Sequence, residues 1–143
     1  QICVDRDLFK KIKCKFKITK KKYEIIGDSP ELKQVFLNII ENAVTHSNSK
    51  KAVIVKLENI KSSVNFSVED FGIGIPNVNI PLLTKRFYRV DEARSRNSGN
   101  TGLGLSIVKH IVNRHNAELD ISSIEGKGTK FSINFNKDKP SLL

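Results

Sequence analysis

A glycine-rich segment and two polar clusters upstream of it hold the residues whose types and spacing could do chemistry. The segment Gly99–Leu105 contains three glycines and leads into apolar residues with helical spacing. A glycine-rich turn that opens a helix presents free backbone N–H groups and the positive end of the helix dipole, which suit a phosphate chain. A turn that merely begins a helix is the alternative, and the motif alone leaves both open.

The second cluster is Glu69–Pro76, where a carboxylate ends an apolar alternating segment and glycines follow. Gly72 and Gly74 carry no side chain, so a planar ligand could lie against the backbone. Asp70 would then accept a hydrogen bond from an exocyclic amine, which adenine offers and guanine lacks at that edge. A calcium-binding or turn loop is the alternative. It is disfavoured because no further acidic residue occupies ligand positions downstream.

The third cluster lies on an expected helix, where Asn38 and Asn42 are four residues apart and His46 follows four later. Residues four apart lie nearly above one another on a helix, so the three side chains form a row beside the apolar stripe. Stacked amides offer oxygens to a hard cation such as Mg²⁺ and donors to phosphate. Ordinary hydrogen bonding at a packing boundary is the alternative.

The elements that must position these clusters follow from the apolar periodicity. A helix is expected from Ser29 as N-cap and Pro30 as first helical residue to about His46, and a second from about Leu103 to His115. The stretch Asn77–Thr101, with one short helical candidate near 81–87, is long enough to be a lid or a disordered connection. Period-2 alternation predicts strands over 11–18, 22–26, 53–57, 64–68, 118–123 and 129–135.

These elements predict an α+β two-layer sandwich, with a mixed, mostly antiparallel sheet and its helices on one face. The first two strands are expected to pair as a hairpin through a turn near Thr19–Lys22. The 143 residues fit a single domain over 1–143, with a core of about 11–136 and a flexible lid of about 77–101. No apolar run is long enough to span a bilayer, so we expect a soluble, cytoplasmic domain.

The net charge of +10 is concentrated in the lysines from Lys10 to Lys22, which alternate with apolar residues. This alternation favours a strand with one solvated face, and lysines there would discourage edge-to-edge pairing. An acidic partner or a membrane surface is the alternative. Nucleic-acid binding is not expected, because no aromatic side chains interleave with the lysines to stack on bases. Cys14 is expected to be a small core residue.

Four segments together resemble the catalytic ATP-binding domain of bacterial sensor histidine kinases, in the superfamily shared with gyrase, Hsp90 and MutL. The segments are Leu37–Ala43, Asp70–Pro76, Arg86–Asp91 and Gly99–Leu105, and the resemblance covers about residues 27–135. It implies the Bergerat ATP-binding fold, with ATP and Mg²⁺ as cofactors. It also implies donation of the γ-phosphoryl group to a histidine on a separate dimerisation domain, for relay to the aspartate of a response regulator.

On the phosphate side, the resemblance implies that Asn42 ligates Mg²⁺ and that Asn38 and His46 line the site. It gives catalytic roles to Asn42 and to Arg89, which would reach the phosphates from the lid. The segment expected to wrap the phosphates is Thr101, Gly102, Leu103, Gly104 and Leu105.

On the adenine side, the resemblance implies that Asp70 binds the amine and that Gly72, Gly74 and Ile75 shape the base pocket. Thr129 would support Asp70 from the neighbouring strand. Thr45 stands where the family usually has lysine, and Thr84 replaces the first phenylalanine of the lid motif. One phosphate contact would therefore be missing unless Lys50, Lys51 or Arg89 supplies it.

The acceptor histidine is expected to be absent from this chain. Family acceptors have an acidic residue directly after the histidine, whereas His46, His110 and His115 are followed by serine, isoleucine and asparagine. We therefore expect no autophosphorylation of the chain alone, and expect His110 and His115 on a helix surface. In the full-length kinase the resemblance implies a dimer, often membrane-anchored.

Two other functions remain as alternatives. A hydrolytic ATPase of the gyrase or Hsp90 kind would need a water-activating glutamate four residues before the metal asparagine, where this chain has Asn38. A non-catalytic binding module is the other, suggested by Thr45 and Thr84. A serine-directed anti-sigma kinase is a nearer relative, but the Arg86–Asp91 lid motif argues against it.

Overall fold

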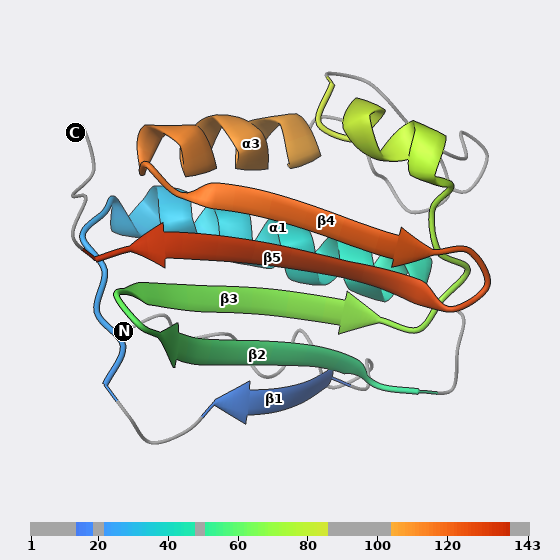
Figure 1. Cartoon of the computed structure of the whole chain (residues 1–143), viewed down its shortest axis with the longest axis horizontal. Helices are drawn as coiled ribbons and strands as arrows, with labels where there is room; N and C mark the ends of the chain where they lie inside the picture. Colours follow the sequence, from blue (N-terminus) through green and yellow to red (C-terminus); the bar gives the residue numbers. More distant parts are fainter. Residues whose placement is uncertain (1–13, 19–21, 48–50, 86–103, 138–143) are drawn as a thin grey trace.

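The computed structural model describes residues 14–18, 22–47, 51–85 and 104–137. The strands are β1 (Cys14–Ile18), β2 (Val53–Ile60), β3 (Ser63–Asp70), β4 (Glu118–Ile124) and β5 (Gly128–Asn136). The helices are α1 (Ser29–His46), the 3₁₀ helix η1 (Asn77–Leu82) and α3 (Gly104–Arg114). Figure 1 shows α1 and α3 packed on the same face of the sheet, so the predicted two-layer α+β architecture is confirmed.

The sheet has the strand order β1-β2-β3-β5-β4, with β1 parallel to β2 and every other neighbouring pair antiparallel. The mixed, mostly antiparallel sheet follows from short turns between β2 and β3 and between β4 and β5, whereas α1 connects β1 to its parallel neighbour β2. β3 therefore lies at the centre, and its last residue, Asp70, is paired with Thr129 of β5.

The hairpin expected over 11–18 and 22–26 is wrong where the structure describes it. Cys14–Ile18 pairs in parallel with Val53–Leu57, and residues 22–26 form no strand. Tyr23 and Ile25 are half-buried against the core, while Glu24 between them is exposed. The alternation of residues 22–26 thus reflects burial of one side of an extended segment. Such a segment has the same period of two as a strand, but it forms no hydrogen-bonded pairing with a neighbouring strand.

The apolar stripe of α1 packs onto the sheet as predicted, with Leu32, Val35, Ile39, Ile40 and Ala43 buried. Val108, Ile111 and Val112 of α3 are buried beside it. The ring of Phe36 lies 4.4 Å from that of Phe66, centroid to centroid, and joins α1 to β3. These contacts hold α1 rigidly across the sheet, so its polar flank keeps a fixed position relative to Asp70.

The start of α1 differs by one residue from the prediction. Asp28, not Ser29, is the N-cap, and its carboxylate accepts a hydrogen bond of 2.9 Å from the backbone N–H of Glu31. Pro30 lies within the first two helical positions, where a missing N–H costs no intrahelical bond. An aspartate and a serine both cap helices well, so the spacing could not separate them.

Three further expectations were tested in the described residues. The short helix expected near 81–87 is instead the 3₁₀ helix Asn77–Leu82, and residues 86 and 87 lie outside the described part. Cys14 is half-buried against the core rather than fully inside it, and burial raises the pKa of its thiol. Lys15 and Lys17 are exposed on β1, but Phe16 and Ile18 are 42% and 50% exposed as well, so the expected strand with only one solvated face is wrong over residues 15–18.

Candidate functional site

Asp70 is a buried carboxylate at the end of the central strand, with only 4% of its surface exposed. Its Oδ1 accepts a 3.0 Å hydrogen bond from the backbone N–H of Gly72. Burial raises the pKa of the Asp70 carboxyl above its ordinary value of 3.8, and backbone hydrogen bonds from Gly72 and Thr129 and the charge of His46 partly oppose that rise. A buried carboxylate whose ionisation is penalised is a common mark of a functional site.

The glycines that follow Asp70 allow close approaches of the backbone to neighbouring elements. A Cβ at position 72 would lie 2.3 Å from the carbonyl oxygen of His46, at the end of α1. Gly74 has φ +74°, and a Cβ there would lie 2.3 Å from the carbonyl oxygen of Ile124. Only glycine fits such contacts without moving backbone. The loop therefore lies between α1 and the β4–β5 turn.

Thr129 lies directly across from Asp70 and is itself buried. Gly128, next to it, has φ +135°, and a Cβ there would lie 2.1 Å from the carbonyl oxygen of Asp70. The structure thus places Thr129 where the sequence predicted it, beside the carboxylate. Ile75 is half-buried, and its backbone N–H donates a 2.7 Å hydrogen bond to Oγ of Ser123 in β4.

Sequence reasoning missed Ser123. Its hydroxyl contacts the backbone of the Asp70 loop and also lies 2.8 Å from the hydroxyl of Thr129. A single serine in a strand of alternating polarity gives no signal of such a role. Only the register of β4 against β5, which pairs Ser123 with Thr129, reveals it.

The polar row of α1 connects two separate parts of the site. At one end, a Cβ on Gly104, the first residue of α3, would lie 3.9 Å from the amide of Asn38. At the other end, His46 contacts Gly72 through its carbonyl. Asn42 lies between them, and all three members of the row are half-buried. The eight helical steps from Asn38 to His46 span about 12 Å of helix axis.

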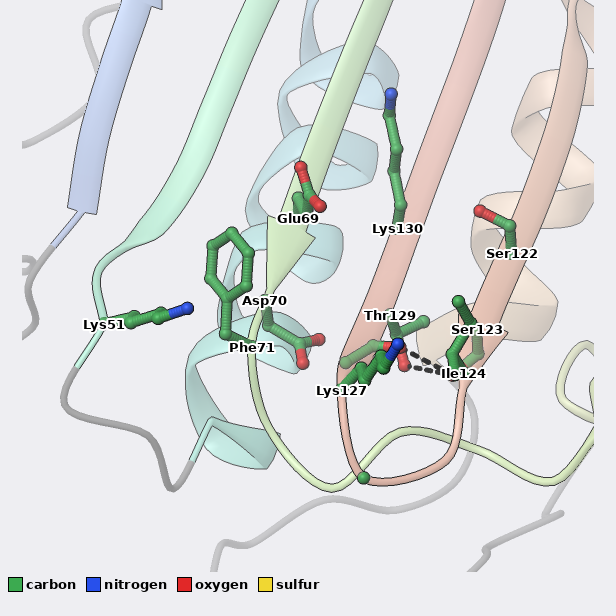
Figure 2. Close-up of a pocket in the computed structure, with 12 residues that line it drawn as sticks. Lys51, Glu69, Asp70, Phe71, Ser122, Ser123, Ile124, Lys127, Thr129 and Lys130 are labelled. Carbon is green, nitrogen blue, oxygen red and sulfur yellow. Dashed lines mark hydrogen bonds between the residues drawn. The ribbon is translucent and has the colours of Figure 1, made fainter.

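A cavity of about 760 Å³ opens at the Asp70 end, next to the β4–β5 turn. Figure 2 shows Asp70, Thr129 and Ser123 there, with the side chains of Glu69, Lys130 and Ser122 on the same strands. The Nζ atom of Lys51 lies 5.3 Å from the centre of the Phe71 ring at this end. Lys51 therefore lies with the carboxylate, away from the Asn38 end of the row.

Several predicted site residues lie outside the described part of the chain: Arg89, Thr101, Gly102 and Leu103. Of the predicted phosphate-wrapping segment, Gly104 and Leu105 are described. Gly104 begins α3 beside Asn38, and Leu105 is half-buried against the core. Thr45, one of the two departures from the family pattern, is exposed on α1.

The residues at the Asn38 end fit a hard cation bound together with a phosphate chain. Amide oxygens of Asn38 and Asn42 are oxygen ligands, which Mg²⁺ prefers, and it usually completes its shell with water and phosphate oxygens. The space that a Cβ on Gly104 would fill lies against Asn38. Among the described residues, no three His, Cys, Asp or Glu side chains gather into a metal cluster.

The fold and this site define a known class of protein. Residues 27–139 match the family of histidine kinase-, DNA gyrase B- and HSP90-like ATPases, and the chain belongs to that family as a catalytic domain of the sensor histidine kinase type. The resemblance stated from the sequence is confirmed. No helix within the described ranges combines the length and apolarity needed to cross a membrane.

Similar proteins are sensor kinases from several bacteria. The phosphate regulon sensor protein PhoR of Pseudomonas aeruginosa is 42% identical over 112 residues, which cover 78% of this chain and 25% of that protein. The sensor histidine kinase YkoH of Bacillus subtilis is 40% identical over 111 residues, covering 78% of this chain and 24% of that protein. The chain thus spans about a quarter of the length of these relatives.

Solved structures share the fold. A mycobacterial sensor histidine kinase, MprB, superposes with a TM-score of 0.77 at 28% identity, over 94% of this chain and 89% of that one. Full-length ShkA in complex with AMPPNP superposes with a TM-score of 0.75 at 24% identity, over 92% of this chain and 27% of that one. At the latter level of identity the likeness concerns the fold alone.

Proposed function

We propose that this chain binds Mg-ATP along the polar row of α1 and donates the γ-phosphoryl group to a histidine on a separate dimerisation domain. The phosphoryl group then passes to an aspartate of a response regulator. One observation carries the proposal: a single helix face joins the buried Asp70 loop to the first residue of α3. A ligand with an amine at one end and phosphates at the other matches this arrangement.

At the base end, Asp70 accepts a hydrogen bond from the exocyclic amine of adenine. Gly72 and Gly74 keep the loop close to α1 and β4, so the carboxylate stays buried and water is excluded from it. A buried acceptor left without its donor costs about 1–3 kcal/mol, so a nucleotide lacking the amine binds at least about tenfold more weakly.

At the phosphate end, Asn42 ligates Mg²⁺, and Asn38 and the backbone at the start of α3 bind phosphate oxygens. The N–H groups of the first turn of a helix have no intrahelical acceptor and point outward, which suits an anion. Mg²⁺ supplies charge neutralisation of the phosphates when it is bound. We assign Arg89 the same task from the lid. Phosphoryl transfer needs little more than such positioning and neutralisation.

Titration calorimetry with AMPPNP tests the binding step. We expect binding that requires Mg²⁺. The substitution Asn42→Ala should remove most of the gain from Mg²⁺, whereas the exposed Thr45→Ala should leave that gain intact. No binding at millimolar ligand would contradict the proposal and leave only a non-catalytic module.

Radiolabel from γ-labelled ATP tests the transfer step. The chain alone should acquire no stable label and should release little phosphate. A dimerising phosphoacceptor domain from a related sensor histidine kinase should become labelled when the chain is added. Sustained phosphate release by the chain alone would instead indicate a hydrolytic ATPase, despite Asn38 at the position of the general base.

A further inference from the structure

Ser123 has a hydroxyl in contact with both the Asp70 loop and the strand that supports Asp70. It is half-buried in β4 and paired with Thr129 of β5. The neighbouring Ser122 is exposed, and successive residues of a strand point to opposite faces of the sheet. The two serines are therefore chemically identical neighbours in different surroundings.

Three contacts surround the hydroxyl of Ser123. Its Oγ accepts a hydrogen bond from the N–H of Ile75 at 2.7 Å and lies 2.9 Å from the carbonyl oxygen of Gly128, which can only accept. Its Oγ also lies 2.8 Å from Thr129 Oγ1, a contact in which either hydroxyl could donate. We assign the single proton of Ser123 to the carbonyl of Gly128, which makes Thr129 Oγ1 the donor to Ser123. Ser123 thereby uses one donor and two acceptor sites and is saturated.

This arrangement determines whether the Thr129 hydroxyl donates or accepts a hydrogen bond toward a ligand. Because its proton is committed to Ser123, its hydroxyl can only accept. Asp70, which lies across from it, also only accepts when ionised. The buried wall formed by Asp70 and Thr129 therefore presents acceptors alone, which favour the amine edge of adenine over the carbonyl edge of guanine.

We propose that Ser123 is a positioning residue. It keeps the Thr129 hydroxyl an acceptor of hydrogen bonds and so contributes to the preference for adenine. The inference rests on the proposed function, since it names the base that the same site selects. Without the Ser123 hydroxyl, Thr129 is free to rotate and donate to a guanine carbonyl. The N–H of Ile75 also loses its acceptor, which loosens the Asp70 loop.

The test measures the affinities of AMPPNP and its guanine counterpart GMPPNP by calorimetry for Ser123→Ala, Ser123→Thr and Ser122→Ala. We expect Ser123→Ala to lower the preference for the adenine nucleotide by about tenfold, which is the effect of one buried hydrogen bond. Ser123→Thr keeps the hydroxyl and should retain most of the preference. Ser122→Ala should behave as the unchanged chain. Denaturant unfolding without nucleotide shows whether each variant is folded.

Three outcomes would overturn the proposal, and they can be told apart. An unchanged preference in Ser123→Ala would contradict it while leaving the proposed function intact. Equal losses of affinity for both nucleotides would show that Ser123 only maintains the fold. An unchanged chain that binds neither nucleotide would overturn the proposed function, and the base preference with it.

Discussion

The two ends of α1 are built for different purposes. At its N-terminal end, His115, the residue directly after α3, is buried, and both of its ring nitrogens are bonded to backbone: Nε2 accepts from the N–H of Asp28 at 3.0 Å, and Nδ1 lies 2.8 Å from the carbonyl of Ile111. At its C-terminal end, His46 and Gly72 enclose Asp70, whose carboxylate is buried at a cost to its ionised form.

We propose that this difference separates residues that stabilise the fold from residues that bind the ligand. The protein itself provides the partners of His115, so the ring links the end of α3 to the start of α1. Asp70 has partners for only part of its hydrogen-bonding capacity, because a carboxylate can accept about four bonds. Under the proposed function, the exocyclic amine of adenine would supply a further hydrogen bond to this carboxylate.

The largest effect on the free energy of unfolding is expected when the ring of His115 and its hydrogen bonds are removed. His115→Ala removes a buried ring and two hydrogen bonds, and should lower the free energy of unfolding by about 2–4 kcal/mol. His110→Ala, at an exposed position of the same helix, should change it by less than about 0.5 kcal/mol. Urea unfolding of both variants measures the difference. Similar small losses in the two variants would contradict the structural role of His115.

The next effect concerns the other end of α1. Asp70→Asn keeps the shape of the side chain but removes its charge. It should weaken AMPPNP binding by at least about tenfold, or about 1.4 kcal/mol, since a hydrogen bond to a charged acceptor is lost. The free energy of unfolding without nucleotide should fall much less. Calorimetry and urea unfolding on the same sample decide this, and equal losses in both would count against a recognition role.

The smallest effect is a pH dependence. The pKa of Asp70 is raised in the folded chain above its ordinary value of 3.8, so the folded state holds this proton at a pH where the unfolded chain has lost it. The contribution of Asp70 to stability therefore falls as the pH rises from 3.8 to the raised pKa, and is constant above it. Asp70→Asn has no carboxyl group at this position, so its stability does not fall in this way as the pH rises.

Stability measured in urea across that pH range should thus shift in favour of Asp70→Asn as the pH rises. The comparison uses the difference between the two proteins, which cancels the titration of all other groups. A difference that stays constant, or that shifts toward the unchanged chain, would show that burial does not penalise the Asp70 charge.

Much of this architecture could be predicted from the sequence. The stripe of α1 and the alternation of apolar residues at 64, 66 and 68 predicted a helix and a strand, and both elements were confirmed. The sequence also indicated a binding role for the Asp70 loop, which stays a prediction because a turn or calcium-binding loop can have the same residue types. The predicted pairing of β1 with residues 22–26 was wrong, because alternation indicates which side of a strand is buried but not which strand lies next to it.

Other errors have related physical causes. His115 was expected on a helix surface, but it is buried because α1 begins against it, a contact between residues far apart in the chain. Ser123 was missed for the same reason: its role depends on β4 lying beside β5 and on the loop of Ile75. Local patterns predict elements and short motifs well, whereas hydrogen bonds between distant segments emerge only from the fold.

The most direct test of the central claim measures thermal unfolding with and without Mg-AMPPNP for the unchanged chain, His115→Ala and Asp70→Asn. A ligand present at about 100 times its Kd stabilises the folded state by about 2.7 kcal/mol. We expect His115→Ala to unfold at a lower temperature but to keep the full increase in unfolding temperature when nucleotide is added. Asp70→Asn should start near the unchanged chain and, with an affinity at least about tenfold weaker, lose about half of that increase or more. The reverse pattern, or equal effects in both variants, would contradict it.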